Sequence, residues 1–185
     1  MERCDLLRED GGRWLEPGAG TGSIIATAQE YRPDVRWTAV ELMADCAPVL
    51  GKLPSTRVVC PQDFLAWAPE AEHTVALGNP PYRLAEEFVR RAAKLVSRAV
   101  VLLLSLNFLG SDQRVPFFEE LLPSRIYQLP NRPSFDKRGS DSVIYGWYCW
   151  LLQEPAPEHV QLIRLASTPL EERKRWSEER LLKGL

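Results

Sequence analysis

The sequence predicts an α/β protein with a mostly parallel sheet, on the basis of three observations. Apolar runs of strand length alternate with helical patterns between Arg13 and Leu152. A glycine-rich loop separates the first of these runs from the first helix. The run Ala99–Leu104 is continuously apolar, which is typical of a central parallel strand that is covered on both faces.

The first strand, loop and helix form one nucleotide-type unit. Arg13–Glu16 is the predicted strand, and a helical pattern runs from Ser23 to about Tyr31. Between them lies Pro17-Gly18-Ala19-Gly20-Thr21-Gly22, whose glycines permit positive φ and let a ligand approach the backbone closely. The start of the helix offers free N–H groups to such a ligand. A plain tight turn explains the same loop almost equally well.

The second predicted strand, Val35–Val40, ends in Glu41, which lies 19 residues after Gly22. An acidic side chain about 20 residues beyond a glycine loop can reach ribose hydroxyls in a dinucleotide-type fold. A solvated glutamate at a strand end is the alternative interpretation. Met43–Lys52 is a candidate helix that Pro48 could break or kink.

Asp63 and Phe64 follow the third predicted strand, Arg57–Cys60. Asp63 could accept a hydrogen bond from an adenine amino group while Phe64 packs on the ring. In the alternative interpretation, Phe64 belongs to the core and Asp63 caps a short helix at Leu65–Trp67.

The segment Gly78-Asn79-Pro80-Pro81-Tyr82 ends the fourth predicted strand, Thr74–Leu77. Two prolines cannot continue a ladder of hydrogen bonds, and each pushes the preceding residue towards extended geometry. The resulting stiff turn presents an amide, Asn79, and an aromatic ring, Tyr82, at the carboxyl edge of the sheet, where open α/β sheets bind ligands. A proline-stiffened turn with an aromatic plug is the simpler interpretation.

The rest of the chain continues the alternation. Helices are predicted at Leu84–Ser97, Pro116–Leu122 and Leu170–Lys183, and strands at Arg125–Leu129, Ser142–Leu152 and, as an extra strand, Val160–Leu165. Residues 130–141 are predicted to be the loop of a wide hairpin, and this loop holds Arg132, Phe135, Lys137 and Arg138. Phe135 is either a stacking platform for a base or a local plug.

Composition argues against several classes of protein. The chain has 185 residues, which suits one domain, and a net charge of −2, which gives no global basic field for nucleic acid. The four cysteines are scattered and lack metal-ligand spacing, so no metal is expected. No signal peptide or membrane-spanning run is visible, so we expect a cytoplasmic protein.

Taken together, the motifs resemble those of class I S-adenosylmethionine-dependent methyltransferases, in particular the small DNA adenine-N6 methyltransferases of phages and prophages. The resemblance covers about Arg13–Leu152 as a methyltransferase core, with residues 153–185 as a C-terminal extension. It implies a Rossmann-like fold with a seven-stranded, mostly parallel sheet whose last strand is antiparallel. It also implies S-adenosylmethionine as the cofactor and DNA as the partner.

The resemblance further implies roles for individual residues. Cofactor binding would fall to Glu16, Pro17, Gly18, Gly20, Gly22, Glu41, Leu42, Asp63, Phe64 and Asn79. Catalysis would fall to Asn79, Pro80 and Tyr82, and substrate binding to Tyr82, Arg132, Phe135, Lys137 and Arg138. In this chemistry the Asn79 side-chain oxygen and the Pro80 carbonyl accept the N–H bonds of the adenine amine. The nitrogen lone pair is then free to attack the sulfonium methyl.

Other acceptors and another class of function stay open. Asn-Pro-Pro-Tyr also occurs in methyltransferases that modify a protein glutamine amide or an RNA base, and a non-catalytic cofactor-binding module is a third possibility. The chain also departs from the DNA-modifying family. The usual Thr-Pro contact before the loop strand is absent, and residues 155–185 are too few for a separate target-recognition domain. Any sequence preference would then come from short loops or a partner.

Overall fold

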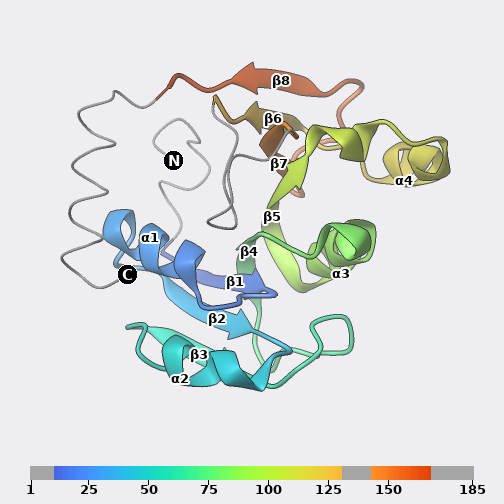
Figure 1. The fold of residues 1–185 in the computed structure, drawn as a ribbon. Coiled ribbons are helices and arrows are strands. Elements are labelled where there is room, and N and C mark those ends of the chain that lie inside the picture. Colours follow the sequence, from blue (N-terminus) through green and yellow to red (C-terminus); the bar gives the residue numbers. More distant parts are fainter. Residues whose placement is uncertain (1–10, 131–142, 168–185) are drawn as a thin grey trace.

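A computed structural model describes residues 11–130 and 143–167 of the chain, and its centre is one eight-stranded sheet. The strands, in chain order, are β1 (Arg13–Pro17), β2 (Arg36–Val40), β3 (Thr56–Val59), β4 (His73–Gly78), β5 (Val96–Ser105), β6 (Arg125–Gln128), β7 (Tyr145–Leu151) and β8 (Gln161–Arg164). The α-helices are α1 (Ser23–Tyr31), α2 (Ala47–Leu50), α3 (Ala85–Leu95) and α4 (Val115–Glu120). Figure 1 shows how the strands follow one another from β3 at one edge to β8 at the other.

The sheet has the order β3-β2-β1-β4-β5-β7-β6-β8. Every neighbouring pair is parallel except the two pairs that β7 forms with β5 and β6. The predicted Rossmann-like methyltransferase fold, with an antiparallel seventh strand, is thus confirmed. The strand number differs from the predicted seven because β8 pairs in parallel with β6, in the place expected for an extra strand at Val160–Leu165.

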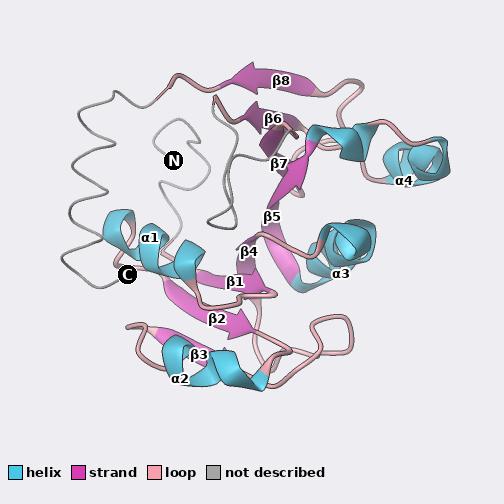
Figure 2. Cartoon of the chain, in the orientation of Figure 1, coloured by secondary structure: helices cyan, strands magenta, loops and turns pink. Residues whose placement is uncertain are grey.

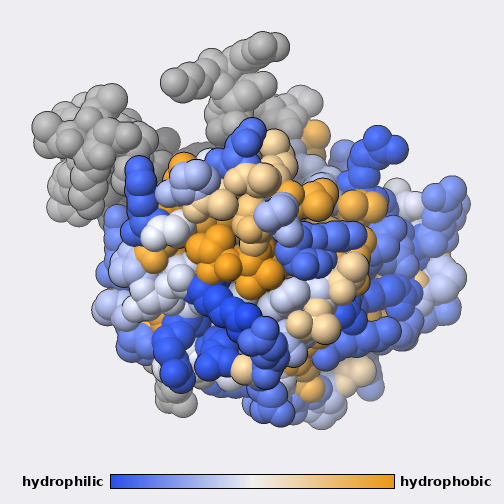
Figure 3. Space-filling view, turned by 90° about the horizontal axis from the view of Figure 1, so that it is seen from below, coloured by the Kyte–Doolittle hydropathy of each residue, from blue (hydrophilic) through white to orange (hydrophobic). Residues whose placement is uncertain are grey.

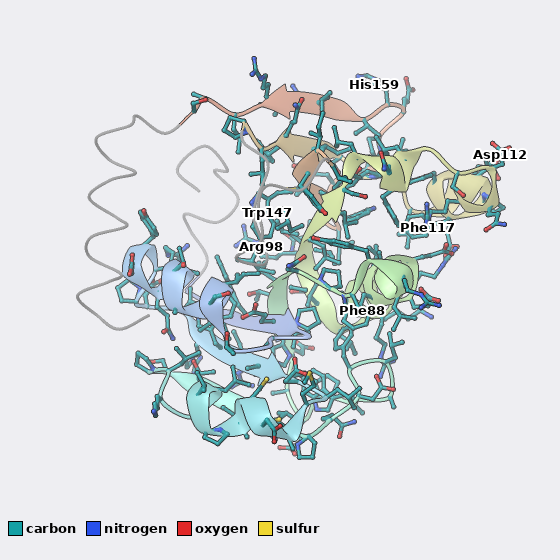
Figure 4. All side chains as sticks on the ribbon, viewed as in Figure 1. Phe88, Arg98, Asp112, Phe117, Trp147 and His159 are labelled. Atoms are coloured by element: carbon teal, nitrogen blue, oxygen red, sulfur yellow. The ribbon has the colours of Figure 1, made fainter. Side chains whose placement is uncertain are left out.

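Helices cover both faces of the sheet, as Figure 2 shows. On one face α1 packs its buried residues Ile25 and Ala28 into a cluster with Trp14 and Trp37. On the other face α3 and α4 contribute Phe88 and Phe117, which are labelled in Figure 4, to a second cluster. Because β5 lies between these two layers, its central residues are buried on both sides, which explains its continuous apolar run.

The bounds of two helices differ from those predicted from the sequence. The helix predicted at Leu84–Ser97 ends at Leu95, because Val96 takes an extended backbone conformation and starts β5 without an intervening loop. The helix predicted at Met43–Lys52 is reduced to a 3-10 turn, η2 (Ala44–Cys46), followed by the four-residue α2. Pro48 lies in the first turn of α2, where its missing N–H costs nothing.

The described helices are all too short or too polar to cross a membrane. The helix predicted at Leu170–Lys183 lies outside the described residues.

His73, at the start of β4, is a buried polar group in the core. Its side chain is 3% exposed, its Nε2 lies 2.9 Å from the Thr38 hydroxyl, and its ring packs edge-on against Trp67. Burial lowers the pKa of His73 to about 4, and the positive charge of Arg13 acts in the same direction. The folded protein therefore holds this imidazole neutral.

This burial predicts an acid-dependent loss of stability. Between pH 6.5 and about 4, His73 takes up a proton in the unfolded chain and not in the folded one, so the free energy of unfolding falls as pH falls through this window. A His73→Gln variant keeps a hydrogen-bonding side chain and does not titrate. Urea denaturation at several pH values should show a shallower decline for the variant than for the wild type. Identical declines would contradict the prediction.

Candidate active site

The glycine loop and the Asn-Pro-Pro-Tyr turn meet at the carboxyl edge of the sheet. They meet because β1 and β4 are parallel neighbours, with Trp14 opposite Val75 and Leu15 opposite Ala76. At the ends of the two strands, a Cβ added to Gly78 would lie 3.1 Å from Pro17 Cδ and 3.2 Å from the Pro17 carbonyl oxygen. A Cβ at this position would require Pro17 or the turn to shift by a few tenths of an ångström, so a glycine suits this close approach. Asn79 therefore leaves the sheet beside the first residue of the glycine loop.

The glycine loop has one packed end and one open side. Gly18, Gly20 and Gly22 have φ values of +66°, +54° and +77°, which side chains with a Cβ rarely adopt. A Cβ on Gly22 would lie 2.5 Å from Leu53 Cδ1, whereas a Cβ on Gly20 would meet nothing within 4 Å. The loop is therefore closed against α2 at Gly22 and open at Gly20, where a ligand can reach the backbone.

Glu41 holds this loop in place. The side chain is 7% exposed, and its two carboxylate oxygens accept hydrogen bonds from Gly20 N–H at 2.7 Å and Met43 N–H at 2.8 Å. A carboxylate has about four acceptor positions, so two remain for a ligand. The sequence pattern indicated a ligand contact for Glu41 but gave no sign that it also ties the end of β2 to the glycine loop.

Glu16 is a second buried carboxyl group at the end of β1. Its Oε2 accepts a hydrogen bond from Ile25 N–H at 3.3 Å, and the residue is 2% exposed. Burial raises the pKa of Glu16 well above its usual value. The Ile25 N–H opposes this shift, and the negative charge of Glu41 adds to it. The site thus has one acidic group biased towards its neutral form close to another that is held by backbone N–H groups.

Asn79 is half-buried, and the environment of its side-chain oxygen is unusual. Its Oδ1 atom is buried and has no hydrogen-bond partner among the described residues. Leaving a buried acceptor unpaired costs about 1–3 kcal/mol, and this oxygen is available to a hydrogen-bond donor of another molecule. Tyr82 follows on the 3-10 helix η3 (Tyr82–Leu84), and its ring centre lies 5.5 Å from that of Tyr145 on β7.

Asp63 and Phe64 differ in their exposure to solvent. Phe64 is 3% exposed and packs at 4.9 Å, centre to centre, on Phe88 of α3. Asp63 is exposed, and its Oδ1 accepts a hydrogen bond from Leu65 N–H at 2.9 Å in a turn. This arrangement is the one expected if Phe64 belongs to the core. A ligand contact by either residue stays a prediction.

Apolar side chains are exposed next to Glu41. Leu42 and Met43 are 65% and 63% exposed, and Val49 on α2 is 44% exposed. Figure 3 shows apolar surface near the middle of the face that is turned downward in Figure 1, the side on which α2 and β3 lie. A buried carboxylate beside exposed apolar side chains suits a ligand with a hydroxylated part and a flat apolar part.

The four predicted substrate contacts of the hairpin loop, Arg132, Phe135, Lys137 and Arg138, lie outside the described residues.

Comparison with solved structures supports the methyltransferase fold. A candidate class I S-adenosylmethionine-dependent methyltransferase from Listeria monocytogenes superimposes with a TM-score of 0.66 at 15% identity, over 94% of this chain and 65% of that one. A predicted O-methyltransferase from Agrobacterium tumefaciens gives 0.63 at 19% identity, over 90% of both chains. The 23S rRNA methyltransferase ErmE gives 0.56 at 18% identity, over 80% of this chain and 64% of ErmE. No protein-family model and no curated protein matches the sequence.

The two sides of the glycine loop predict different effects of adding a methyl group. Gly20→Ala should lower stability by about 1–2 kcal/mol, because only the left-handed backbone is strained. Gly22→Ala should lower stability by about 1–3 kcal/mol more than Gly20→Ala does, because the new methyl overlaps Leu53 and Leu50. Urea denaturation of both variants measures the difference. Equal losses, or a larger loss for Gly20→Ala, would show that the loop is not packed as described.

Proposed function

We propose that this protein is an S-adenosylmethionine-dependent methyltransferase that acts on the N6 amino group of adenine in DNA. The observation that carries the proposal is the buried Oδ1 of Asn79 beside the glycine loop, for which the described residues supply no hydrogen-bond donor. An amide oxygen without a partner, followed by Pro80-Pro81-Tyr82, suits an acceptor that brings an N–H donor and a flat ring.

The residues around the glycine loop fit the cofactor. Gly20 leaves room for close approach to the backbone, and the free acceptor positions of Glu41 can bind ribose hydroxyls. Leu42 and Met43 offer apolar surface to an adenine ring, and Asp63 lies beyond the neighbouring strand β3 as a candidate partner for its amino group. The bound cofactor supplies a methyl group activated by a positively charged sulfonium.

The residues of the turn would prepare the acceptor amine. The Asn79 side-chain oxygen and the Pro80 carbonyl each accept one N–H bond, which localises the nitrogen lone pair that the adenine ring otherwise withdraws. The cofactor held at the glycine loop would supply its methyl group to this lone pair, its sulfur would keep the electrons of the broken carbon–sulfur bond, and the amine would lose one proton to solvent. The Tyr82 ring would stack on the base after it leaves the duplex, with Tyr145 supporting it from β7.

DNA is the first choice of acceptor because the order of motifs resembles the DNA adenine enzymes. An RNA base and a glutamine amide are the alternatives, since each presents a planar NH2 group that Asn79 and Pro80 can bind in the same way. Incubation with labelled cofactor separates them. Label in unmethylated adenine-containing DNA supports the proposal, label in RNA or glutamine redirects it, and no label in any acceptor supports a non-catalytic module.

The role of Asn79 predicts a separation of binding from turnover. Asn79→Ala should lower kcat by about 10²–10³-fold, because one preorganised acceptor of the reacting amine is lost. The cofactor Kd, measured by calorimetry, should change by less than about threefold. A change of that size corresponds to well under 1.4 kcal/mol of binding free energy. Unchanged turnover, or loss of cofactor binding, would refute the role.

The role of Glu41 predicts the opposite pattern. Glu41→Gln keeps the shape of the side chain. It replaces one carboxylate oxygen, which accepts a hydrogen bond from a backbone N–H, with an NH2 group, which can only donate. The cofactor Kd should rise by about 10- to 100-fold, as expected for losing a hydrogen bond to a charged group. A melting curve of the variant without cofactor measures how far the substitution destabilises the glycine loop itself. A Kd equal to that of the wild type would exclude Glu41 from the cofactor site.

A further inference from the structure

A cavity lies next to the candidate active site and shares Tyr82 with it. Its volume is about 260 Å³, and its lining includes Tyr82, Arg83, Ser105, Asn107, Phe108 and Arg114. No residue of the glycine loop lines it, and neither does Asn79. The cavity is therefore separate from the proposed cofactor site and adjoins the acceptor side. It is formed where β5 ends and the 3-10 helices η4 (Leu106–Leu109) and η5 (Asp112–Arg114) follow.

Two arginines, Arg83 and Arg114, line the cavity, and neither has an acidic partner among the described residues. No carboxylate of the described residues lies within 4.0 Å of Arg83 or Arg114. Arg90, on the next turns of α3, is different, because it pairs with both Glu86 and Glu120. Two unpaired positive charges in one cavity of an acidic protein favour an anionic ligand.

Arg114 is held in position for such a ligand. Its Nη1 donates to the Phe108 carbonyl at 3.3 Å, and its guanidinium carbon lies 4.7 Å from the centre of the Phe108 ring. A guanidinium has five N–H donors, so most of them stay available. Stacking on an aromatic ring also limits the motion of the arginine, which reduces the entropy lost when an anion binds.

The other lining residues narrow the choice of anion. Ser105 and Asn107 add neutral hydrogen-bonding groups, while Ala85, Leu104 and Phe108 form apolar wall. The volume is below the range of about 300–1,000 Å³ that is usual for pockets of drug-sized ligands. A phosphate with its sugar fits this combination of size, charge and apolar wall, whereas a whole dinucleotide or a second cofactor does not.

We propose that this cavity binds a backbone phosphate of the acceptor strand, next to the base that enters the active site. The proposal rests on the proposed function, because it assigns the strand to the same acceptor side. Arg83 follows Tyr82 directly in the chain, so a phosphate bound here lies beside the ring proposed to stack on the base. The arginines then act as positioning residues that set where the strand lies.

The test uses binding and turnover as separate measurements. The probe is a fluorescent single-stranded DNA of about 12 nucleotides with one adenine, within the usual range of single-strand sites. Arg83→Ala and Arg114→Gln are compared with Arg36→Ala, which removes an exposed positive charge at the start of β2, away from the carboxyl edge. Melting curves confirm that each variant is folded; Arg83 is exposed and carries the test if Arg114→Gln is unstable.

The expected result is a loss of strand affinity without loss of chemistry. Each cavity variant should bind the DNA about 5- to 10-fold more weakly, and the slope of log affinity against log salt should fall by about 0.7 for each phosphate contact removed. The kcat at saturating DNA should stay within about threefold of the wild type, and Arg114→Lys should restore part of the affinity. Arg36→Ala should leave the affinity and the salt slope nearly unchanged.

Failure of the proposal differs from failure of the proposed function. If Arg83→Ala and Arg114→Gln bind DNA as Arg36→Ala does, the cavity does not hold the strand, whatever the enzyme methylates. The same conclusion follows if inorganic phosphate binds the cavity while the substitutions leave DNA affinity unchanged. If the wild type binds DNA through these arginines but transfers no methyl group, the cavity assignment stands and the proposed function fails.

Discussion

The contact between Gly78 and Pro17 is the constraint on which the candidate active site depends. It brings the ends of β1 and β4 together with no side chain between them. A larger residue at position 78 would push the Asn-Pro-Pro-Tyr turn away from the glycine loop by displacing the Pro17 ring or its carbonyl. Such a shift matters because orientation effects are lost over distances of about 1 Å. The parallel pairing of two strands far apart in the sequence thus creates the site.

Glu41 links the stability of the glycine loop to the proposed cofactor binding at this edge. Its two backbone hydrogen bonds join the glycine loop to the segment that follows β2, so the loop geometry exists before any ligand arrives. Preorganisation of this kind lowers the cost of binding, because fewer groups must be ordered at that moment. The carboxyl group of Glu16, with its raised pKa, lies nearby and limits how much negative charge the edge carries. A cationic cofactor would therefore meet a moderate negative field.

The acceptor side has a different character. It is made by the end of β5, the segment after it and η3, where two aromatic rings, two arginines and an amide line one cavity. Beneath it, Tyr148 donates to the Ser105 carbonyl at 3.1 Å and Trp150 donates to the Leu121 carbonyl at 3.0 Å. These two bonds tie β7 to the last residue of β5 and to the residue that follows α4. The proposed cofactor contacts follow the parallel strands β1 and β2, whereas Tyr82 of the proposed acceptor side packs against Tyr145 of the antiparallel strand β7.

The sequence by itself determined the alternation of strands and helices, and it placed the glycine loop and the Asn-Pro-Pro-Tyr turn at the ends of two strands. These features follow from local rules: periodicity, glycines that permit positive φ, and prolines that end a strand. The antiparallel last strand was implied by the family resemblance, in agreement with the predicted wide hairpin. The sequence pattern overextended the helix at Leu84–Ser97, because helical periodicity does not show that Val96 already pairs with His73. Pro48 is likewise compatible with a helix only in the first turn. The sequence pattern did not show that α2 begins at Ala47, one residue before it.

Only the tertiary structure decided that Phe64 is core, that Arg83 and Arg114 line one cavity, and that Asn79 Oδ1 is buried with no donor from the described part of the chain. Each of these facts depends on side chains from strands and helices that are distant in sequence. Local pattern carries no information about such distances, because they are set by the pairing order of the strands.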